Sequence, residues 1–307
     1  MEHVFTAIVP IFLIIGFGTF LKAKAGFKDE FWRYAEKITF NWLFPALLFL
    51  KISGADIDWG VALPVAAIIV IGIHLTACAA LPFRRPLAMS PERFVSVFQG
   101  GFRSNAYVGI AIVLGILGDA ATGELAVSLF TVAVTINYLG VWGHLKWLDR
   151  PGGSKGWKGV ILDSVRNPLI LGCLLGGLFN LTGWQLPPVV SSTLDLLSRA
   201  SLPMALMAVG AGLTLHAVRN AGLSVILACV LKLLLQPALT YGLGLAFGIE
   251  GYALIVPVIF AALPTSSTSY VVSRQMGSDA PAAAAIVTVT HLAAIVTLPV
   301  LLMLLQH

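Results

Sequence analysis

The amino-acid sequence predicts an all-α integral membrane protein with ten spanning helices. Hydrophobic residues make up 58% of its 307 residues and charged residues only 11%, whereas soluble domains carry about 25% charged residues. Apolar runs of about 20 residues, the length that crosses a bilayer, recur ten times between short linkers. We expect these spans at 4–21, 34–53, 61–81, 94–117, 123–147, 166–182, 188–213, 220–247, 251–274 and 280–305.

The distribution of charge sets the expected orientation of the spans. Lysine and arginine fill the linkers that follow the odd-numbered spans, whereas the other linkers hold acidic residues such as Asp56, Asp119 and Glu250. Because basic linkers stay in the cytoplasm, we expect both termini on the periplasmic side of a bacterial inner membrane. The net charge of +5 is therefore attributed to topology and not to nucleic-acid binding.

One offset of 158 residues recurs along the chain. It aligns Pro10 with Pro168, Gly18 with Gly176, Pro45 with Pro203, His74 with Lys232, and Ala106 with Pro264. The halves 1–150 and 151–307 would then each hold five spans, and an odd number of spans forces the second copy to enter the membrane inverted. Prolines that recur by chance are the alternative explanation of the offset.

The fourth span of each half is interrupted at its centre. The first reads GGFRSNAYVG (100–109) and the second reads AALPTSSTSY (261–270). Glycine and proline break helices, and unwound backbone survives in a bilayer only where protein or a water-filled cavity satisfies it. The N–H groups freed at the start of a half-helix favour an anion, so we expect an anion site here. Alternatively, the hydroxyls only bond back to the backbone around a proline kink.

Charged residues inside spans indicate function by default. Arg103 either adds positive potential at the anion site or extends toward the cytoplasm. Lys232 either attracts an anion or pairs with Asp195, which is the only carboxylate expected to be buried in a span. Asp195 and Arg199 also have the i, i+4 spacing of a helical salt bridge.

Four uncharged polar residues interrupt other apolar runs. His291 either relays protons or is a packing histidine with satisfied hydrogen bonds, and His74 carries the same two alternatives. Asn41 and Asn137 either line a cavity or form hydrogen bonds between helices.

Five stretches carry a family resemblance that covers essentially the whole chain. They are NWLFPALLF (41–49), RSNAYVGIA (103–111), SLPMALMAVGAGL (201–213), KLLLQPAL (232–239) and AALPTSSTSYVVSRQMG (261–277). Together they resemble the auxin efflux carrier family, which includes plant auxin exporters and bacterial permeases named for malonate or malate. Ala111 stands where the plant exporters have a proline, and their long cytoplasmic loop is missing.

The resemblance implies two inverted five-helix repeats with crossed broken helices, similar to bile-acid sodium symporters and NhaA-type antiporters. It also implies scaffold and transport domains that each mix helices of both repeats, an elevator-type motion and a homodimer. The substrate would bind near the crossing, which corresponds to Asn105, Ala106, Tyr107, Gly109, Pro264, Thr265, Ser266, Ser267 and Thr268. The residues inferred above to join this site are Arg103, Asn41, Asn137 and Lys232.

The expected function is a secondary or potential-driven transporter of small organic anions, such as malonate or auxin-like acids, without cofactors. Proton coupling would involve Asp195, Arg199, His291 or His74, and sodium-coupled symport is the alternative. An intramembrane enzyme is disfavoured, because no HExxH or GxSxG motif is present. The spacing of the cysteines suggests neither a metal site nor a disulfide framework. A channel would need selectivity-filter rings, and none is visible.

Overall fold

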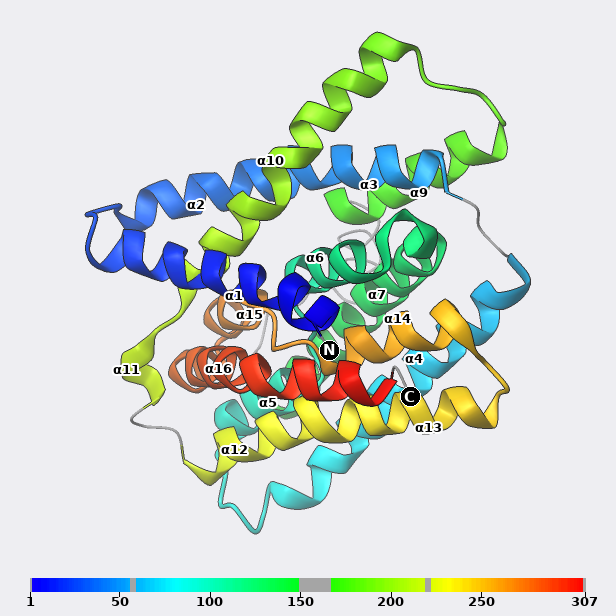
Figure 1. The fold of residues 1–307 in the computed structure, drawn as a ribbon. Helices are drawn as coiled ribbons and strands as arrows, with labels where there is room; N and C mark the ends of the chain where they lie inside the picture. Colours follow the sequence, from blue (N-terminus) through cyan, green and yellow to red (C-terminus); the bar gives the residue numbers. More distant parts are fainter. Residues whose placement is uncertain (1, 56–58, 149–166, 219–221, 306–307) are drawn as a thin grey trace.

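The computed structural model describes residues 2–55, 59–148, 167–218 and 222–305, which are helical apart from turns and one isolated β-bridge (Figure 1). The helices are α1 (Glu2–Ala23), α2 (Asp29–Ile38), α3 (Phe44–Ser53), α4 (Trp59–Ala80), α5 (Pro91–Gly100), α6 (Ala106–Leu117), α7 (Thr122–Trp147), α9 (Pro168–Leu181), α10 (Pro188–Gly212), α11 (Leu215–Val218), α12 (Leu223–Val230), α13 (Gln236–Ala246), α14 (Gly251–Ala262), α15 (Thr268–Met276) and α16 (Ala280–Leu305).

Helices occupy all ten predicted positions, but they differ in length. Five helical stretches of the described chain are long and apolar enough to cross a membrane: Gly60–Phe83, Ala106–Trp147, Pro188–Gly212, Leu223–Ala246 and Ala280–Leu305. Three shorter apolar helices are Ile8–Ala23, Pro168–Leu181 and Gly251–Ala262. The helical fold is therefore confirmed, and its long apolar helices are consistent with an integral membrane protein, while the number of ten spans remains a prediction.

Two of the helical stretches contain a π-helical turn just before a proline. Thr39–Leu43 joins α2 to α3 ahead of Pro45, and Leu231–Leu235 joins α12 to α13 ahead of Pro237. Proline lacks an N–H and clashes with the preceding α-helical turn, and a wider turn accommodates it without ending the helix. Such turns are frequent at functional sites, and the second one carries Lys232.

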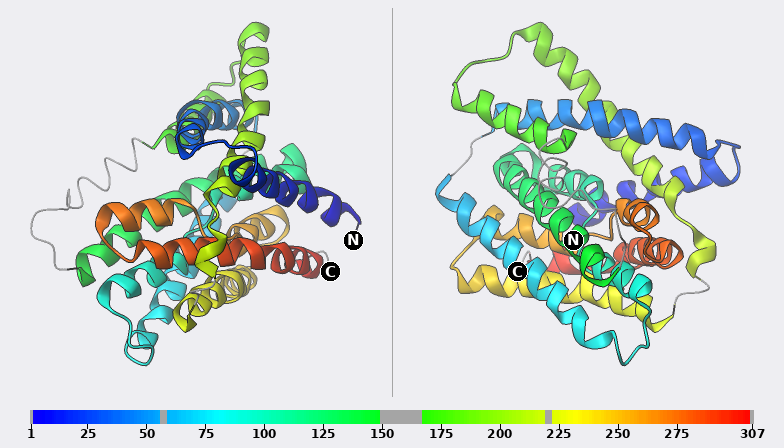
Figure 2. Two further views of the ribbon diagram at one scale, coloured as in Figure 1. Left: turned by 90° about the vertical axis from the view of Figure 1, so that its left-hand side faces the viewer. Right: turned by 180° about the vertical axis from the view of Figure 1, so that it is seen from behind.

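One group of helices packs with its backbones in direct contact. A Cβ on Gly210 of α10 would lie 1.7 Å from the carbonyl oxygen of Ile15 in α1, so only glycine permits this approach. α3 packs along α9 beside this pair. With α2, these four helices occupy the upper part of Figure 1, while α4, α5 and α12 to α16 lie below them, and Figure 2 shows the same division from two further sides.

Two helices are interrupted where the sequence predicts it. α5 ends at Gly100 and α6 begins at Ala106, while α14 ends at Ala262 and α15 begins at Thr268. The restarts at residues 106 and 268 are 162 residues apart and not 158, so the alignment of Ala106 with Pro264 is displaced by four residues. The inverted repeat itself remains a prediction.

Candidate functional site

The two interruptions lie against each other and satisfy each other's backbone. Ser104 and Thr265 form the isolated antiparallel β-bridge. Beside this pair, the N–H of Asn105 donates to the carbonyl of Pro264 at 3.0 Å. In return, the N–H of Ser266 donates to the carbonyl of Arg103 in the first break at 3.1 Å. Unwound backbone persists in a bilayer only with such partners, so the meeting of the breaks explains why both helices tolerate them.

Two side-chain hydroxyls complete this exchange. Ser104 Oγ donates to the carbonyl of Phe260 in the last turn of α14, and Thr265 Oγ1 donates to the carbonyl of Gly100 at the end of α5, each at 2.7 Å. The last carbonyls of a helix have no partner within that helix, so each break caps the helix of the other. The Thr265 hydroxyl, predicted as a donor to an anion, donates instead to this helix end.

Asn105 caps the first turn of α6. Its Oδ1 accepts hydrogen bonds from the N–H groups of Tyr107 at 3.1 Å and Val108 at 3.5 Å, so its Nδ2 faces Nε2 of His291 at 3.1 Å. Nδ1 of His291 donates to the carbonyl of Val287 at 2.7 Å, which assigns the ring proton to Nδ1. The amide oxygen of Asn105 is therefore used within the protein, whereas only one of the two N–H groups of Nδ2 is directed at His291.

Lys232 stabilises the interrupted end of α14. Its side chain is fully buried, and Nζ donates to Oε1 of Gln236 at 2.8 Å and to the carbonyl of Ala261. A cation at a helix C-terminus interacts favourably with the helix dipole and satisfies a terminal carbonyl. The predicted pairing of Lys232 with Asp195 is wrong.

Arg103 brings positive charge to the meeting point of the breaks. The residue is 4% exposed, and its guanidinium donates to the carbonyl of Ile136 at 3.4 Å, Oδ1 of Asn137 at 3.1 Å and Oγ1 of Thr268 at 3.3 Å. In the described part of the chain it forms no ion pair with a carboxylate. Of the two alternatives for Arg103, the structure favours a charge held inside the protein.

Several buried donors, on Arg103 and on the two neighbours of its partner Thr268, have no partner among the described residues. Arg103 Nε and the hydroxyls of Ser267 and Ser269 are buried without a hydrogen bond to any described residue. Ser266 Oγ and Thr268 Oγ1 lie 2.9 Å apart and are half-buried at the start of α15. Burying an unpaired charge and unpaired donors is unfavourable unless a counter-charge is present. This cluster, which we call the Arg103 cluster, is therefore complementary to an anion.

Small residues let the two breaks approach. A Cβ on Gly109 of α6 would lie 2.6 Å from Cδ1 of Leu263, so a larger residue would displace the Leu263 side chain at the second break. Ala106, the first residue of α6, is partly exposed, and Pro264 is buried. These three predicted site residues shape the crossing rather than supply polar groups to it.

Three other predicted residues lie apart from the Arg103 cluster. Tyr107 stacks on Phe44 of α3, with ring centroids 4.7 Å apart and planes at 4°. Asn41 donates to the carbonyl of Lys37 in its own helix at 2.7 Å, so its amide does not bridge helices. His74 forms its hydrogen bonds on α4 and α7.

Asp195 and Arg199 lie on an outward face of α10. The predicted i, i+4 ion pair is present, with Arg199 Nε 2.8 Å from Asp195 Oδ2. The Asp195 side chain is 44% exposed, so the prediction of a buried carboxylate is wrong. Its neighbour Leu196 is also exposed, which places this pair away from the Arg103 cluster.

Gln99 and Ser273 were not predicted, yet they tie α5 to α15 beside the breaks. Gln99 Nε2 donates to Ser273 Oγ at 2.7 Å and to the carbonyl of Ser269 at 3.3 Å. His144 of α7, also missed, lies 3.1 Å from Ser278 Oγ. A glutamine directly before the glycine pair of the first break was the available sequence signal for Gln99.

The fold and the Arg103 cluster together define a class of protein. Broken membrane helices that meet around a buried charge are typical of secondary transporters. Among the described residues, no group of three His, Cys, Asp or Glu side chains could hold a metal ion.

The chain belongs to the Membrane transport protein family, whose model matches residues 3–302. It is 23% identical to "Uncharacterized transporter YfdV" of Escherichia coli (strain K12), over 95% of this chain and 94% of that protein. An "Uncharacterized transporter" of Methanothermobacter thermautotrophicus is 22% identical over 95% of both chains. The "Putative malonate transporter" of Rhizobium meliloti (strain 1021) is 25% identical over 70% of this chain and 68% of that protein. The family resemblance seen in the sequence is thus confirmed.

Proposed function

We propose that this protein carries small organic anions across the membrane by alternating access, with a substrate carboxylate bound at the Arg103 cluster. The observation that carries this proposal is the burial of the Arg103 guanidinium, without a carboxylate partner among the described residues, where two broken helices meet. A substrate carboxylate supplies the missing negative charge. It also accepts hydrogen bonds from Arg103 Nε and from the hydroxyls of Ser267 and Ser269.

The chemistry of the cluster favours a carboxylate over a spherical anion. A guanidinium is a planar fork of donors that matches the two oxygens of one carboxylate. Asn137 and Thr268 both accept hydrogen bonds from Nη2 of Arg103, which fixes the direction of the guanidinium before a substrate arrives and leaves Nε without a partner among the described residues. The name of the Rhizobium meliloti relative adds support for malonate as a member of the substrate class.

We further propose that α1, α2, α3, α9 and α10 form the scaffold of an elevator-type transporter. The close backbone contact of α1 with α10 and the packing of α3 along α9 support a rigid unit. The remaining helices, including both breaks, would move as the transport domain. The proposal also includes ten spans arranged as two inverted repeats. Both termini would lie outside, and the protein would assemble as a homodimer.

Coupling to protons or to membrane potential is favoured over coupling to sodium. The described part of the site offers no carboxylate, and three terminal carbonyls of α5 and α14 already accept hydrogen bonds. Protonation of His291 at Nε2 would place two donors face to face, because Asn105 Nδ2 already points at that atom. His291 is therefore the proposed proton-linked residue, whereas Asp195, Arg199 and His74 lie outside the site.

Membrane potential alone gives a large driving force for such a substrate. Moving one elementary charge across 100 mV changes its free energy by about 2.3 kcal/mol, which is about a 50-fold concentration ratio. A membrane that is negative inside would drive a monoanion outward. A potential-driven form of this protein would therefore act as an exporter.

Flux in proteoliposomes tests the proposal. Malonate, malate, succinate and indole-3-acetate are offered singly under imposed pH, sodium and voltage gradients. We expect saturable uptake of at least one acid, stimulated by counter-substrate inside the vesicle. Sodium-dependent uptake would favour symport, unsaturable flux would indicate a channel, and chemical conversion of the solute would indicate an enzyme. No flux of any carboxylate would exclude the proposed substrate class.

A further inference from the structure

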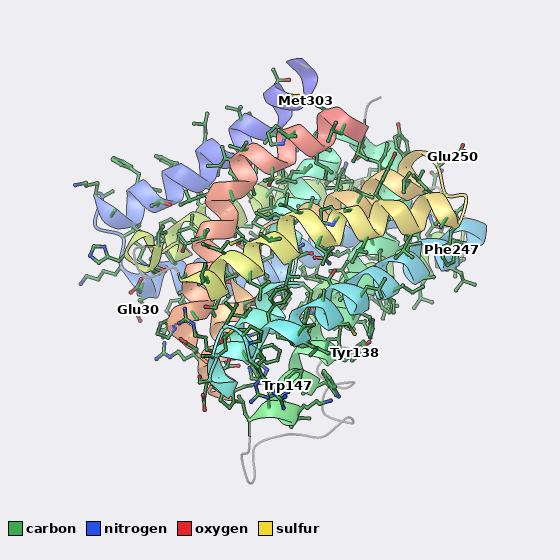
Figure 3. The ribbon with its side chains drawn as sticks, turned by 90° about the horizontal axis from the view of Figure 1, so that it is seen from below. Glu30, Tyr138, Trp147, Phe247, Glu250 and Met303 are labelled. Atoms are coloured by element: carbon green, nitrogen blue, oxygen red, sulfur yellow. The ribbon has the colours of Figure 1, made fainter. Side chains whose placement is uncertain are left out.

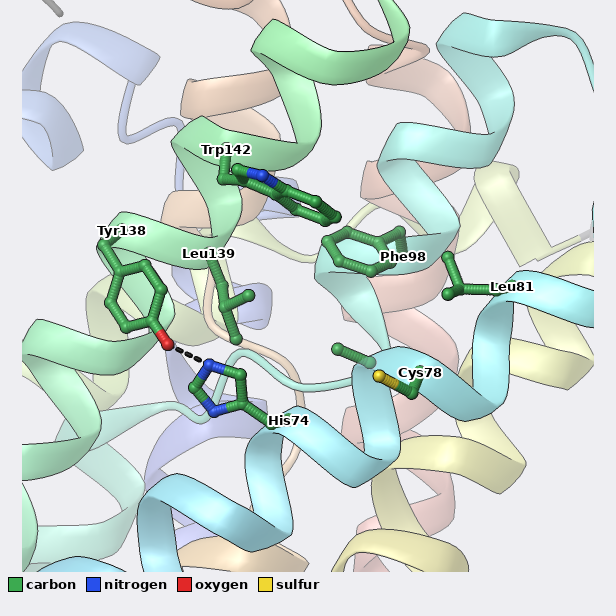
Figure 4. A pocket seen from close by; sticks show the side chains of 8 residues that line it. His74, Cys78, Leu81, Phe98, Tyr138, Leu139 and Trp142 are labelled. Carbon is green, nitrogen blue, oxygen red and sulfur yellow. Dashed lines mark hydrogen bonds between the residues drawn. The ribbon is translucent and has the colours of Figure 1, made fainter. Parts of the chain in front are cut away.

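A cavity of about 300 Å³ lies between α4, α5 and α7, and no residue of either break lines it. Figure 4 shows its wall, which includes His74, Cys78, Phe98, Tyr138 and Trp142. In Figure 3 the labelled Tyr138 and Trp147 mark the part of α7 beside it. The cavity is thus a separate feature from the Arg103 cluster.

The wall of this cavity is almost entirely hydrocarbon. His74 and Tyr138 are polar, but the tyrosine hydroxyl donates to Nε2 of His74, and Nδ1 of His74 donates to the carbonyl of Val70 at 2.7 Å. The remaining lining groups are aliphatic or aromatic, with a single thiol at Cys78. No cationic side chain lines the cavity, so it fits a hydrocarbon chain better than an organic anion.

Two cations lie near the cavity, each against an aromatic ring that lines it or packs on its wall. Lys146 Nζ is 4.7 Å from the ring centroid of Trp142, which lines the cavity, and the Arg84 guanidinium is 5.7 Å from the ring of Phe94. The rings of Phe94 and Trp147 are 4.9 Å apart and connect the two cations. Within the described residues, neither cation forms an ion pair.

An apolar cavity with two nearby cations, neither of them ion-paired within the described residues, is complementary to one kind of membrane molecule. Basic side chains between membrane helices attract anionic lipid headgroups, and aromatic rings at the interface pack against acyl chains. We propose that the cavity binds an acyl chain of an anionic phospholipid, whose phosphate is bound nearby by Arg84 and Lys146. The expected topology places these two cations at the cytoplasmic leaflet.

Fluorescence quenching by brominated lipids tests this proposal. The protein is placed in phosphatidylcholine nanodiscs that contain a small fraction of phosphatidylglycerol or phosphatidylcholine with brominated chains. The difference in fluorescence between the wild-type protein and Trp142→Phe isolates the emission of Trp142. We expect stronger quenching by brominated phosphatidylglycerol. The double variant Arg84→Gln/Lys146→Gln should weaken this preference by about 25-fold, because each basic residue contributes about fivefold.

A matched charge removal and a filled cavity serve as controls. Lys24→Gln removes an exposed cation in another basic linker and should leave the preference unchanged. Cys78→Phe projects from an exposed position into the cavity and should reduce quenching by both lipids. Equal quenching of the wild-type protein by the two lipids would overturn the proposal that the bound lipid has an anionic headgroup. Unchanged quenching in Cys78→Phe would overturn the assignment of the lipid acyl chain to this cavity. Displacement of the brominated lipid by a water-soluble aromatic carboxylate would overturn it as well.

Discussion

The two broken helices exchange equivalent hydrogen bonds but differ in chemistry. Each contributes one residue to the β-bridge and one hydroxyl to the other's helix end. The first break, residues 101–105, is entirely buried and holds the fixed charge of Arg103 and the cap of Asn105. The second break exposes part of Ser266 and Ser267 at the start of α15.

This difference teaches that equivalent interruptions need not do equal work at a site. Arg103 is held by an amide, a hydroxyl and a carbonyl, so its charge is oriented in advance. A serine hydroxyl rotates freely about its bond to carbon and can donate in several directions. The first break would therefore fix where an anion binds, and the second would adapt to its shape.

Removal of the charge at the first break should have the largest effect. Arg103→Gln is expected to lower kcat/KM for the transported acid by roughly 10- to 100-fold, because hydrogen bonds to charged groups contribute about 1.5–3 kcal/mol. Proteoliposome uptake measures this change. Arg103→Lys should retain part of the activity, since lysine keeps the charge but loses the planar fork.

The control for this experiment is another arginine on a predicted span. Arg199 is exposed on α10 and paired with Asp195, so Arg199→Gln should transport at the wild-type rate. Wild-type kinetics in Arg103→Gln would mean that the first break has only a structural role, and the contrast between the breaks would disappear.

Removal of the reciprocal hydroxyls tests the shared part of the comparison. Ser104→Ala and Thr265→Val each leave a buried helix-terminal carbonyl unpaired, which should cost about 1–3 kcal/mol of stability. The apparent Tm in detergent should fall by similar amounts in both variants. Ser191→Ala is the matched hydroxyl control, because the hydrogen bond from Ser191 Oγ to the carbonyl of Pro188 on α10 is exposed. A large fall in only one of the two variants would show that the exchange is not symmetric.

Loss of the cap of α6 should have an effect on stability similar to that of the reciprocal hydroxyls. Asn105→Ala removes an N-cap, which is worth about 1 kcal/mol, and leaves the buried Nε2 of His291 without its donor. The apparent Tm should therefore fall about as much as in the Ser104 and Thr265 variants.

His291→Gln should keep its flux in the absence of a pH gradient but should no longer be stimulated when a pH gradient is imposed. Full stimulation of His291→Gln by a pH gradient would exclude this residue from proton coupling.

The smallest effect is expected from one hydroxyl of the second break. Ser267 Oγ has no partner among the described residues, so Ser267→Ala should leave the apparent Tm unchanged. Loss of a neutral hydrogen bond of about 0.5–1.5 kcal/mol to the substrate would raise KM roughly 2- to 10-fold. A lower Tm with an unchanged KM would instead mean that this hydroxyl only stabilises the helix.

Several features of the fold could be predicted from the sequence because they depend on local chemistry. Apolar runs of membrane length predict helices, and the residue pairs Gly100–Gly101 and Leu263–Pro264 locate the breaks. The Asp195–Arg199 pair follows from helical spacing alone. Its exposure did not follow, because periodicity does not say which side of α10 faces the rest of the chain.

The partners of polar groups were decided by distant segments. Lys232 bonds to Ala261, which is 29 residues away, and Thr265 bonds to Gly100 across 165 residues. Neither contact leaves a trace in local sequence, since it depends on how the breaks of two helices cross. The sequence therefore predicted Lys232 and Thr265 as partners of an anion, whereas the structure uses both to satisfy helix ends.

The sequence by itself determined that the chain is a helical membrane protein and where two of its helices must open. These properties follow from hydropathy and from backbone chemistry, which each residue carries with it. Only the tertiary structure decided which polar groups are consumed by the protein and which remain for a ligand. Burial forces most donors and acceptors to find partners, and the unpaired donors beside Arg103 are among the few described polar atoms for which the packing provides none.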